Sequence, residues 1–158
     1  MGRFGMAAIC VLLGVKSVYA MQLDKTAIKS DEIMCAKINL YHEARGETFL
    51  GMMKIMDVVM SRVSSDDFPN NICDVVWQGF DKKIAQFSWT NDGKYDHLVK
   101  SKDWSLVSDA VDIYMTFDVF DDADQKILYY QAGPVTNWFK KALKPVTKVG
   151  NHTFWKEK

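Results

Sequence analysis

The sequence predicts a single α+β domain that is mainly helical, and two patterns carry this prediction. Apolar residues recur at helical spacing over about 33–44, 49–63 and 104–117. The last third instead contains segments rich in β-branched and aromatic residues, Ile127–Tyr130 and Val146–Trp155. No internal repeat, low-complexity tract or interdomain linker divides the sequence, so we expect one domain after the N-terminal segment.

Length and charge limit the class of protein. At 158 residues, with 48% hydrophobic and 25% charged residues, the chain is long enough and apolar enough to bury a core. Lys plus Arg and Asp plus Glu both number 20, so no overall positive field would hold a nucleic acid. We therefore expect no nucleic-acid partner, although Lys140, Lys141 and Lys144 form a local basic cluster in the sequence.

The N-terminus has the features of a signal peptide. Arg3 supplies positive charge, Phe4–Val15 is an apolar stretch, and Val18 and Ala20 fit the positions before a cleavage site. We predict a signal peptide over 1–20, an exported domain over 21–158, and no stable membrane span after cleavage, because the apolar stretch is shorter than the ~20 residues of a spanning helix. An uncleaved anchor and a buried helix are the alternatives.

Export changes the interpretation of the cysteines. Cleavage would remove Cys10 and leave Cys35 and Cys73. An even number of cysteines outside the cytoplasm suggests a disulfide, which would stabilise the fold by ~3–4 kcal/mol. Free buried thiols are the alternative, and two cysteines are too few for a cysteine zinc cage.

Local signals place the helices. Ser30 is a suitable N-cap for the first helix, which Gly46 ends or bends. The second helix covers about Phe49–Val63, and its methionines are better explained as core residues than as ligands. A third covers about Trp104–Phe117.

The connecting segments are mostly polar. Residues 64–71 have the composition of a loop, Ile72–Trp77 is a short helical turn, and Asn91-Asp92-Gly93 is a turn signal. The acidic stretch 118–124 is interpreted as a solvated loop, because it lacks the spacing and glycine of an EF-hand calcium loop.

Two carboxylates, Glu43 and Glu47, stand four residues apart at the end of the first helix, with Arg45 between them. On one helix face they would repel, which would raise the pKa of one carboxyl as a general acid requires. Spacing alone, however, favours a solvated helix-end salt bridge among the three residues.

Other reaction centres have weaker support. The zinc-protease motif H-E-x-x-H is not completed, since Gly46 occupies the second histidine position. A site built from His42, His97 and His152 is a minor alternative, and we expect no metal and no cofactor. Aromatic residues near predicted loops could instead stack on sugar rings, beside the amide and acid side chains of Gln86, Asn91 and Asp92, although core packing is the commoner use of such residues. These aromatic residues are Phe87, Trp89, Tyr95, Tyr130, Trp138 and Trp155.

Four segments in order resemble the SleB-type cell-wall hydrolases, which include spore cortex-lytic enzymes, Gram-negative relatives and phage endolysins. They are Tyr41–Glu47, Phe68–Val76, Gln86–Gly93 and Gly150–Trp155. The resemblance covers about Cys35–Trp155 and implies a lysozyme-like, lytic-transglycosylase-like domain with a small β region in its last third. It also implies a peptidoglycan glycan strand as the substrate, and we expect the protein to be a monomer.

The resemblance assigns roles residue by residue. Glu43 matches the catalytic acid of the family's E-A-x-G-E motif, and Glu47 looks like a supporting residue. Arg45 and Tyr130 are further supporting candidates, while the substrate-binding candidates are Gln86, Ser88, Trp89, Asp92 and His152. Many relatives carry Thr-His-Tyr-His where this chain has Leu128-Tyr129-Tyr130-Gln131, so no role can be transferred to those histidines. For His152, a structural hydrogen bond is the first expectation and substrate contact the second.

The implied chemistry is lytic transglycosylation, in which one glutamic acid cleaves the MurNAc–GlcNAc bond and the MurNAc 6-hydroxyl closes on C1. Glu47 on the same helix face would be poorly placed to act across the sugar as a second carboxylate. A hydrolytic muramidase, an N-acetylmuramoyl-L-alanine amidase and a non-catalytic glycan-binding module are the alternatives. The sequence leaves open whether the site of action is the periplasm or the outer wall, and whether the role is remodelling or phage lysis.

Overall fold

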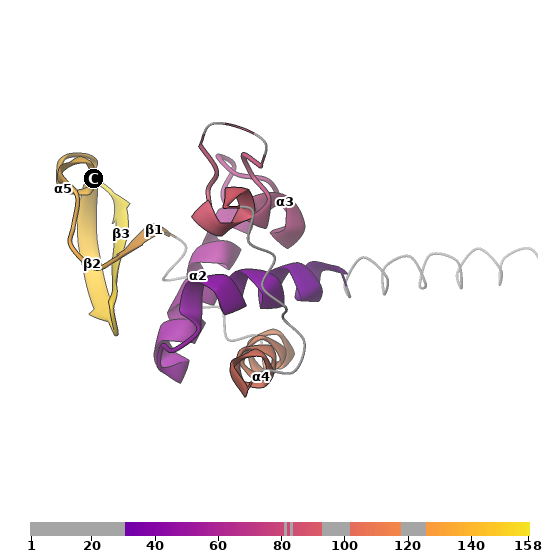
Figure 1. Cartoon of the computed structure of the whole chain (residues 1–158). Helices are drawn as coiled ribbons and strands as arrows, with labels where there is room; N and C mark the ends of the chain where they lie inside the picture. Colours follow the sequence, from indigo (N-terminus) through magenta and orange to yellow (C-terminus); the bar gives the residue numbers. More distant parts are fainter. Residues whose placement is uncertain (1–30, 81, 83, 93–101, 118–125) are drawn as a thin grey trace, which may run out of the picture. The chain divides into compact units, whose positions relative to one another are not determined.

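The structure is a computed structural model that describes residues 31–80, 82, 84–92, 102–117 and 126–158. Residues Glu32–Lys158 form one compact unit (Figure 1). The predicted signal peptide, the Ser30 cap, Tyr95, His97 and the acidic stretch 118–124 lie outside the described residues. Within the described part of the chain, no helix is long and apolar enough to cross a membrane.

The first two helices are joined by a tight turn. The first runs over residues 31–44, and Gly46 follows it with a φ of 87°, the left-handed conformation that glycine adopts without steric cost. Helix α2, Phe49–Val63, begins at Thr48, whose hydroxyl accepts a hydrogen bond from the Gly51 amide at 3.2 Å. The predicted end of the first helix and the bounds of the second are confirmed.

A short helix is fastened to the first one by two different links. Helix α3, Ile72–Val76, begins at Asn71, whose side chain accepts from the Asp74 amide at 2.8 Å. The Glu32 carboxylate accepts from the Ile72 amide, and Cys35 forms a disulfide with Cys73. The predicted disulfide is therefore present, and the sequence separation of 38 residues that it closes corresponds to ~3–4 kcal/mol of stabilisation.

Two further helical elements follow α3 along the chain. A 3-10 turn, η1, covers Ser88–Asn91, and helix α4 covers Lys102–Thr116, close to its predicted range. Helix α4 contacts α2, and the Tyr114 hydroxyl donates to the buried Asp57 carboxylate of α2 at 2.8 Å. This bond satisfies a polar group that would otherwise be costly to bury.

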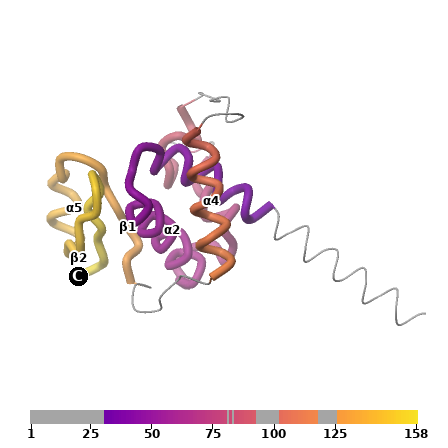
Figure 2. The backbone as a smooth tube through the Cα atoms, turned by 90° about the horizontal axis from the view of Figure 1, so that it is seen from below, coloured from indigo at the N-terminus to yellow at the C-terminus, as the bar shows by residue number. Residues whose placement is uncertain are grey.

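The last third forms a three-stranded antiparallel sheet, with β1, Ile127–Ala132, β2, Leu143–Val149, and β3, His152–Glu157. The strand order is β1-β3-β2, so the final strand lies between the other two. Helix α5, Asn137–Ala142, connects β1 to β2, and β1 lies against α2 (Figure 2). The prediction of a small β region is confirmed.

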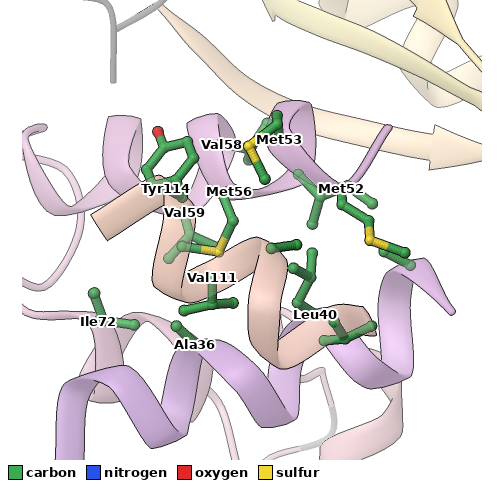
Figure 3. Packing of buried hydrophobic residues seen from close by; sticks show 14 of the residues in the cluster. Ala36, Leu40, Met52, Met53, Met56, Val58, Val59, Ile72, Val111 and Tyr114 are labelled. Atoms are coloured by element: carbon green, nitrogen blue, oxygen red, sulfur yellow. The ribbon is translucent and has the colours of Figure 1, made fainter. Parts of the chain in front are cut away.

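Helix α2 supplies the centre of the core. Met52, Met56 and Val59 are at most 1% exposed and pack against Leu40 of the first helix and Val111 of α4 (Figure 3). The predicted core role of the methionines is thus confirmed. Since α2 contacts both α4 and β1, it joins the helical part to the sheet.

Candidate active site

Glu43 lies in the last turn of the first helix and is engaged by the sheet. The Tyr130 hydroxyl, on β1, donates a hydrogen bond to Glu43 Oε2 at 2.9 Å. The two residues are 87 positions apart in the sequence, so only the fold brings them together. Glu43 is partly buried and hydrogen-bonded, so the interpretation of a freely solvated helix-end carboxylate is wrong.

A buried cation, Arg62, completes the surroundings of this carboxyl. Arg62 is 4% exposed, and its Nε donates to the Leu128 carbonyl of β1 at 2.9 Å. Sequence reasoning missed it. The available signal was its position on the apolar stripe of α2, three and four residues after Val59 and Val58, because a charged residue on a core stripe needs a specific partner.

These groups act on the Glu43 carboxyl in opposite directions. Burial is the largest effect and raises the Glu43 pKa above its ordinary value, while the Tyr130 hydrogen bond and the positive charge of Arg62 lower it. Burial, with the Glu43 charge as a smaller cause, also raises the pKa of Tyr130, so its phenol stays a hydrogen-bond donor. Glu47, whose repulsion was predicted to raise the Glu43 pKa, is not among the causes of the shift.

Glu47 lies in a different environment, which corrects the prediction that both carboxylates share a helix face. The first helix ends at residue 44, so Glu47 stands in the turn before α2 and reaches the β2–β3 turn. Its Oε2 accepts from the Asn151 amide at 3.4 Å, and its Oε1 lies 3.4 Å from His152 Nδ1. The i, i+4 geometry fails because Gly46, in the left-handed conformation, ends the helix between the two residues.

His152 and Glu47 form a buried electrostatic contact. Their side chains are 6% and 8% exposed, but His152 Nδ1 has no partner with the alignment of a hydrogen bond among the described residues. Burial lowers the His152 pKa, and the Glu47 carboxylate acts the other way. His152 therefore fits a structural role beside Glu47 better than an exposed substrate contact, while the expected roles of both residues stay predictions.

The predicted glycan-contact segment, Gln86–Asp92, contacts the first helix through the Trp89 side chain. The Trp89 ring stacks on His42 with a centroid distance of 4.4 Å and an interplanar angle of 8°, and its Nε1 donates to Asn39 Oδ1 at 3.1 Å. Gln86, Ser88 and Asp92 flank or begin the 3-10 turn and are at least partly exposed. The segment thus has a fixed indole with polar, solvent-accessible neighbours.

Some of the predicted surface aromatics belong to the core instead. Phe87 and Trp155 are 2% and 4% exposed, so for these two rings the alternative of core packing is confirmed and stacking on sugars is not. Burying a large ring removes more apolar surface from water than leaving it in a loop. Trp138 on α5 is 58% exposed, and the Tyr130 hydroxyl donates a hydrogen bond to Glu43.

Arg45 is exposed and its guanidinium lies 5.1 Å from the Tyr41 ring centroid. The cation that acts on Glu43 is Arg62, which is far away in the sequence. No cluster of three or more His, Cys, Asp or Glu side chains that could hold a metal ion occurs among the described residues, a set that excludes His97.

Comparison with known proteins defines the family and the class of fold. The sequence model of the cell wall hydrolase family matches residues 46–155, and the chain belongs to this family. The match begins three residues after Glu43 and does not include it.

The relatives agree with this class. The chain is 25% identical over 117 residues to a spore cortex-lytic enzyme of Bacillus cereus, covering 74% of this chain and 41% of that protein. It also resembles the catalytic domain of the B. cereus SleB protein, with a TM-score of 0.58 over 80% of this chain and 91% of that one. The catalytic domain of the germination-specific lytic transglycosylase SleB from Bacillus anthracis gives a TM-score of 0.60 over 79% and 93%, and both structures are 25% identical to this chain. The fold is lysozyme-like, as predicted, and the family acts on the cell wall.

Proposed function

We propose that this protein is an exported lytic transglycosylase that cleaves the MurNAc–GlcNAc bond of peptidoglycan, with Glu43 as its single acid and base. One observation carries the proposal. Glu43 is a partly buried carboxyl with a raised pKa, bonded to a tyrosine hydroxyl from the sheet. A carboxyl that keeps its proton closer to neutral pH can donate that proton to a glycosidic oxygen.

The Tyr130 bond suggests which oxygen donates. Because Tyr130 donates to Oε2, the proton of the neutral acid is favoured on Oε1. Oε1–H protonates the glycosidic oxygen as its bond to MurNAc C1 breaks, and GlcNAc leaves with a hydroxyl. The MurNAc 6-hydroxyl then bonds to C1 and returns its proton to the Glu43 carboxylate, which gives a 1,6-anhydro end and restores the acid.

The position of Glu47 favours this one-carboxylate route. A retaining or inverting hydrolase needs a second carboxyl group ~5–9.5 Å away on the other side of the sugar. Glu47 is instead bonded to the Asn151 amide and lies beside His152, with its side chain 8% exposed. A carboxylate held in this way serves the structure of the site better than attack on a sugar.

The 3-10 turn and its neighbours supply the proposed substrate contacts. Trp89 offers an indole fixed by His42 and Asn39, and Gln86, Ser88 and Asp92 offer solvent-accessible polar groups for sugar hydroxyls. The signal peptide over 1–20 would deliver the monomeric domain to the periplasm or the outer wall, and mass determination of the purified secreted protein tests the cleavage site.

Digestion of purified sacculi, followed by mass spectrometry of the products, tests the reaction. Anhydro-MurNAc ends are expected, whereas reducing MurNAc ends would identify a muramidase and released peptide stems an amidase. Glu43→Gln should reduce the rate of product release by ~10²–10⁴-fold. Activity should persist in EDTA, and its loss there would overturn a mechanism that uses carboxyl chemistry alone.

A further inference from the structure

We propose that Arg62 is a positioning residue of the Glu43 site, a caged cation that fixes strand β1 beside α2 and faces the Glu43 carboxyl with positive charge. This inference rests on the proposed role of Glu43. It concerns a residue that neither the motif Tyr41–Glu47 nor the glycan-contact segment includes.

The cage around Arg62 is built from two rings and one carbonyl. The guanidinium carbon lies 5.3 Å from the Phe68 ring centroid and 5.2 Å from that of Phe87, and Nε donates to the Leu128 carbonyl. Aromatic faces stabilise a desolvated guanidinium at such distances, and the hydrogen bond from Nε fixes the position of its stem. Arg62 is therefore held in one orientation.

This orientation controls where the Tyr130 hydroxyl lies. Leu128 and Tyr130 are two residues apart on β1, which shows a register irregularity between Ile127 and Tyr129. The ladder is locally disrupted at such an irregularity, so an external contact helps the strand to keep its register. The Arg62–Leu128 bond supplies such a contact just before the residue that bonds Glu43.

The burial of Arg62 has a cost that packing alone does not explain. Its Nη1 is buried without a hydrogen-bond partner among the described residues, and an unsatisfied donor on a charged group is destabilising. An apolar residue would pack between Phe68 and Phe87 without this cost. A positive charge at this place is useful if it stabilises the carboxylate that forms when Glu43 gives up its proton.

Within the described part of the chain, the titratable groups that face the pair come from β1 and α2. From β1, Tyr130 faces both Glu43 and Arg62, and Tyr129 faces Arg62. From α2, Arg62 is the charge that acts on Glu43. Since Tyr130 keeps its proton because burial and the Glu43 charge raise its pKa, Arg62 supplies the full positive charge that favours the Glu43 carboxylate.

Direct titration of Glu43 tests the proposal. The carboxyl carbon of Glu43 is followed by ¹³C NMR against pH in the wild type, Arg62→Gln and Arg62→Lys. Gln retains a donor for Leu128 but no charge, so its Glu43 midpoint should rise by about half a pH unit or more, and Lys should stay near the wild type. An unchanged midpoint in folded Arg62→Gln overturns the proposal.

Phe68→Leu is the matched control. It removes one ring without changing charge, while Phe87 and the Leu128 carbonyl still hold the guanidinium, so it should lower the melting temperature but leave the Glu43 midpoint in place. An equal rise in Phe68→Leu and Arg62→Gln would assign the effect to packing and overturn the proposal. If Arg62→Gln does not fold, a midpoint raised in Arg62→Lys while its ammonium is charged also overturns the proposal.

The sacculus assay separates this proposal from the proposed function. A raised Glu43 midpoint in Arg62→Gln, with anhydro products formed by the wild type, supports both. The same shift in a protein whose wild type releases no anhydro ends supports the role of Arg62 and contradicts transglycosylation.

Discussion

Glu43 and Glu47 are four residues apart, yet they belong to two different regions of the molecule. Glu43 belongs to the end of the first helix and meets β1 through Tyr130, with the charge of Arg62 nearby. Glu47 belongs to the following turn and meets the β2–β3 turn through Asn151 and His152. The difference shows that two identical side chains, four residues apart, acquire different surroundings from the strands and turns that the sheet presents to them.

The most direct test of this difference replaces each carboxyl by its neutral isostere. Glu43→Gln should reduce the rate of anhydro-muropeptide release by ~10²–10⁴-fold, since it removes the general acid. Glu47→Gln should retain most of the rate per folded molecule, because its carboxylate holds the turn. Rates are measured on sacculi at equal concentrations of folded protein, and equal losses in both variants would remove the distinction.

The turn that receives Glu47 provides the second test. Gly150 has a φ of 57°, and a Cβ there would overlap the Glu47 carboxylate, whereas Gly133 has a φ of 69° with no atom within 4 Å of such a Cβ. Gly133→Ala should cost ~1 kcal/mol of the free energy of unfolding through backbone strain alone. Gly150→Ala should cost ~1–3 kcal/mol more, and urea denaturation of both variants measures the difference.

The tyrosine that engages Glu43 provides the third. Tyr130→Phe removes a hydrogen bond that lowers the Glu43 pKa, so the fall in kcat/KM at high pH should move to still higher pH, with a rate loss of ~10-fold. Tyr129→Phe is the control, because that hydroxyl donates to the exposed Glu157 at 3.3 Å. A pH profile that shifts in neither variant would contradict the contact between Tyr130 and Glu43.

The smallest expected effect concerns stability. Because burial raises the Glu43 pKa in the folded state, the native protein binds this proton more tightly than the unfolded chain. The Glu43 contribution to stability is therefore largest at low pH and declines as pH rises from the ordinary value of 4.5 through the raised one. Glu43→Gln should be more stable than the wild type at pH 8, by at most about 1 kcal/mol, and the advantage should vanish near pH 4, as calorimetry can show.

Much of the fold could be predicted from local sequence. Helical stripes, the Gly46 boundary and the cysteine pair depend on neighbours along the chain or on simple counting, and the structure has them in the expected places. The last third, rich in β-branched and aromatic residues, forms the three strands of the sheet. The strand order β1-β3-β2 could not be predicted from local sequence, because strand order depends on packing between distant segments.

The sequence by itself determined the family motifs and the class of fold, and its resemblance to the family made Glu43 the candidate acid. Only the tertiary structure decided that Glu47 faces another region, that Phe87 and Trp155 are buried, and that Arg62 and Tyr130 surround Glu43. The reason is physical. Helix propensity and turn chemistry act over a few residues, whereas burial, and the pKa shifts that it produces, depend on which distant side chains exclude water from a given carboxyl.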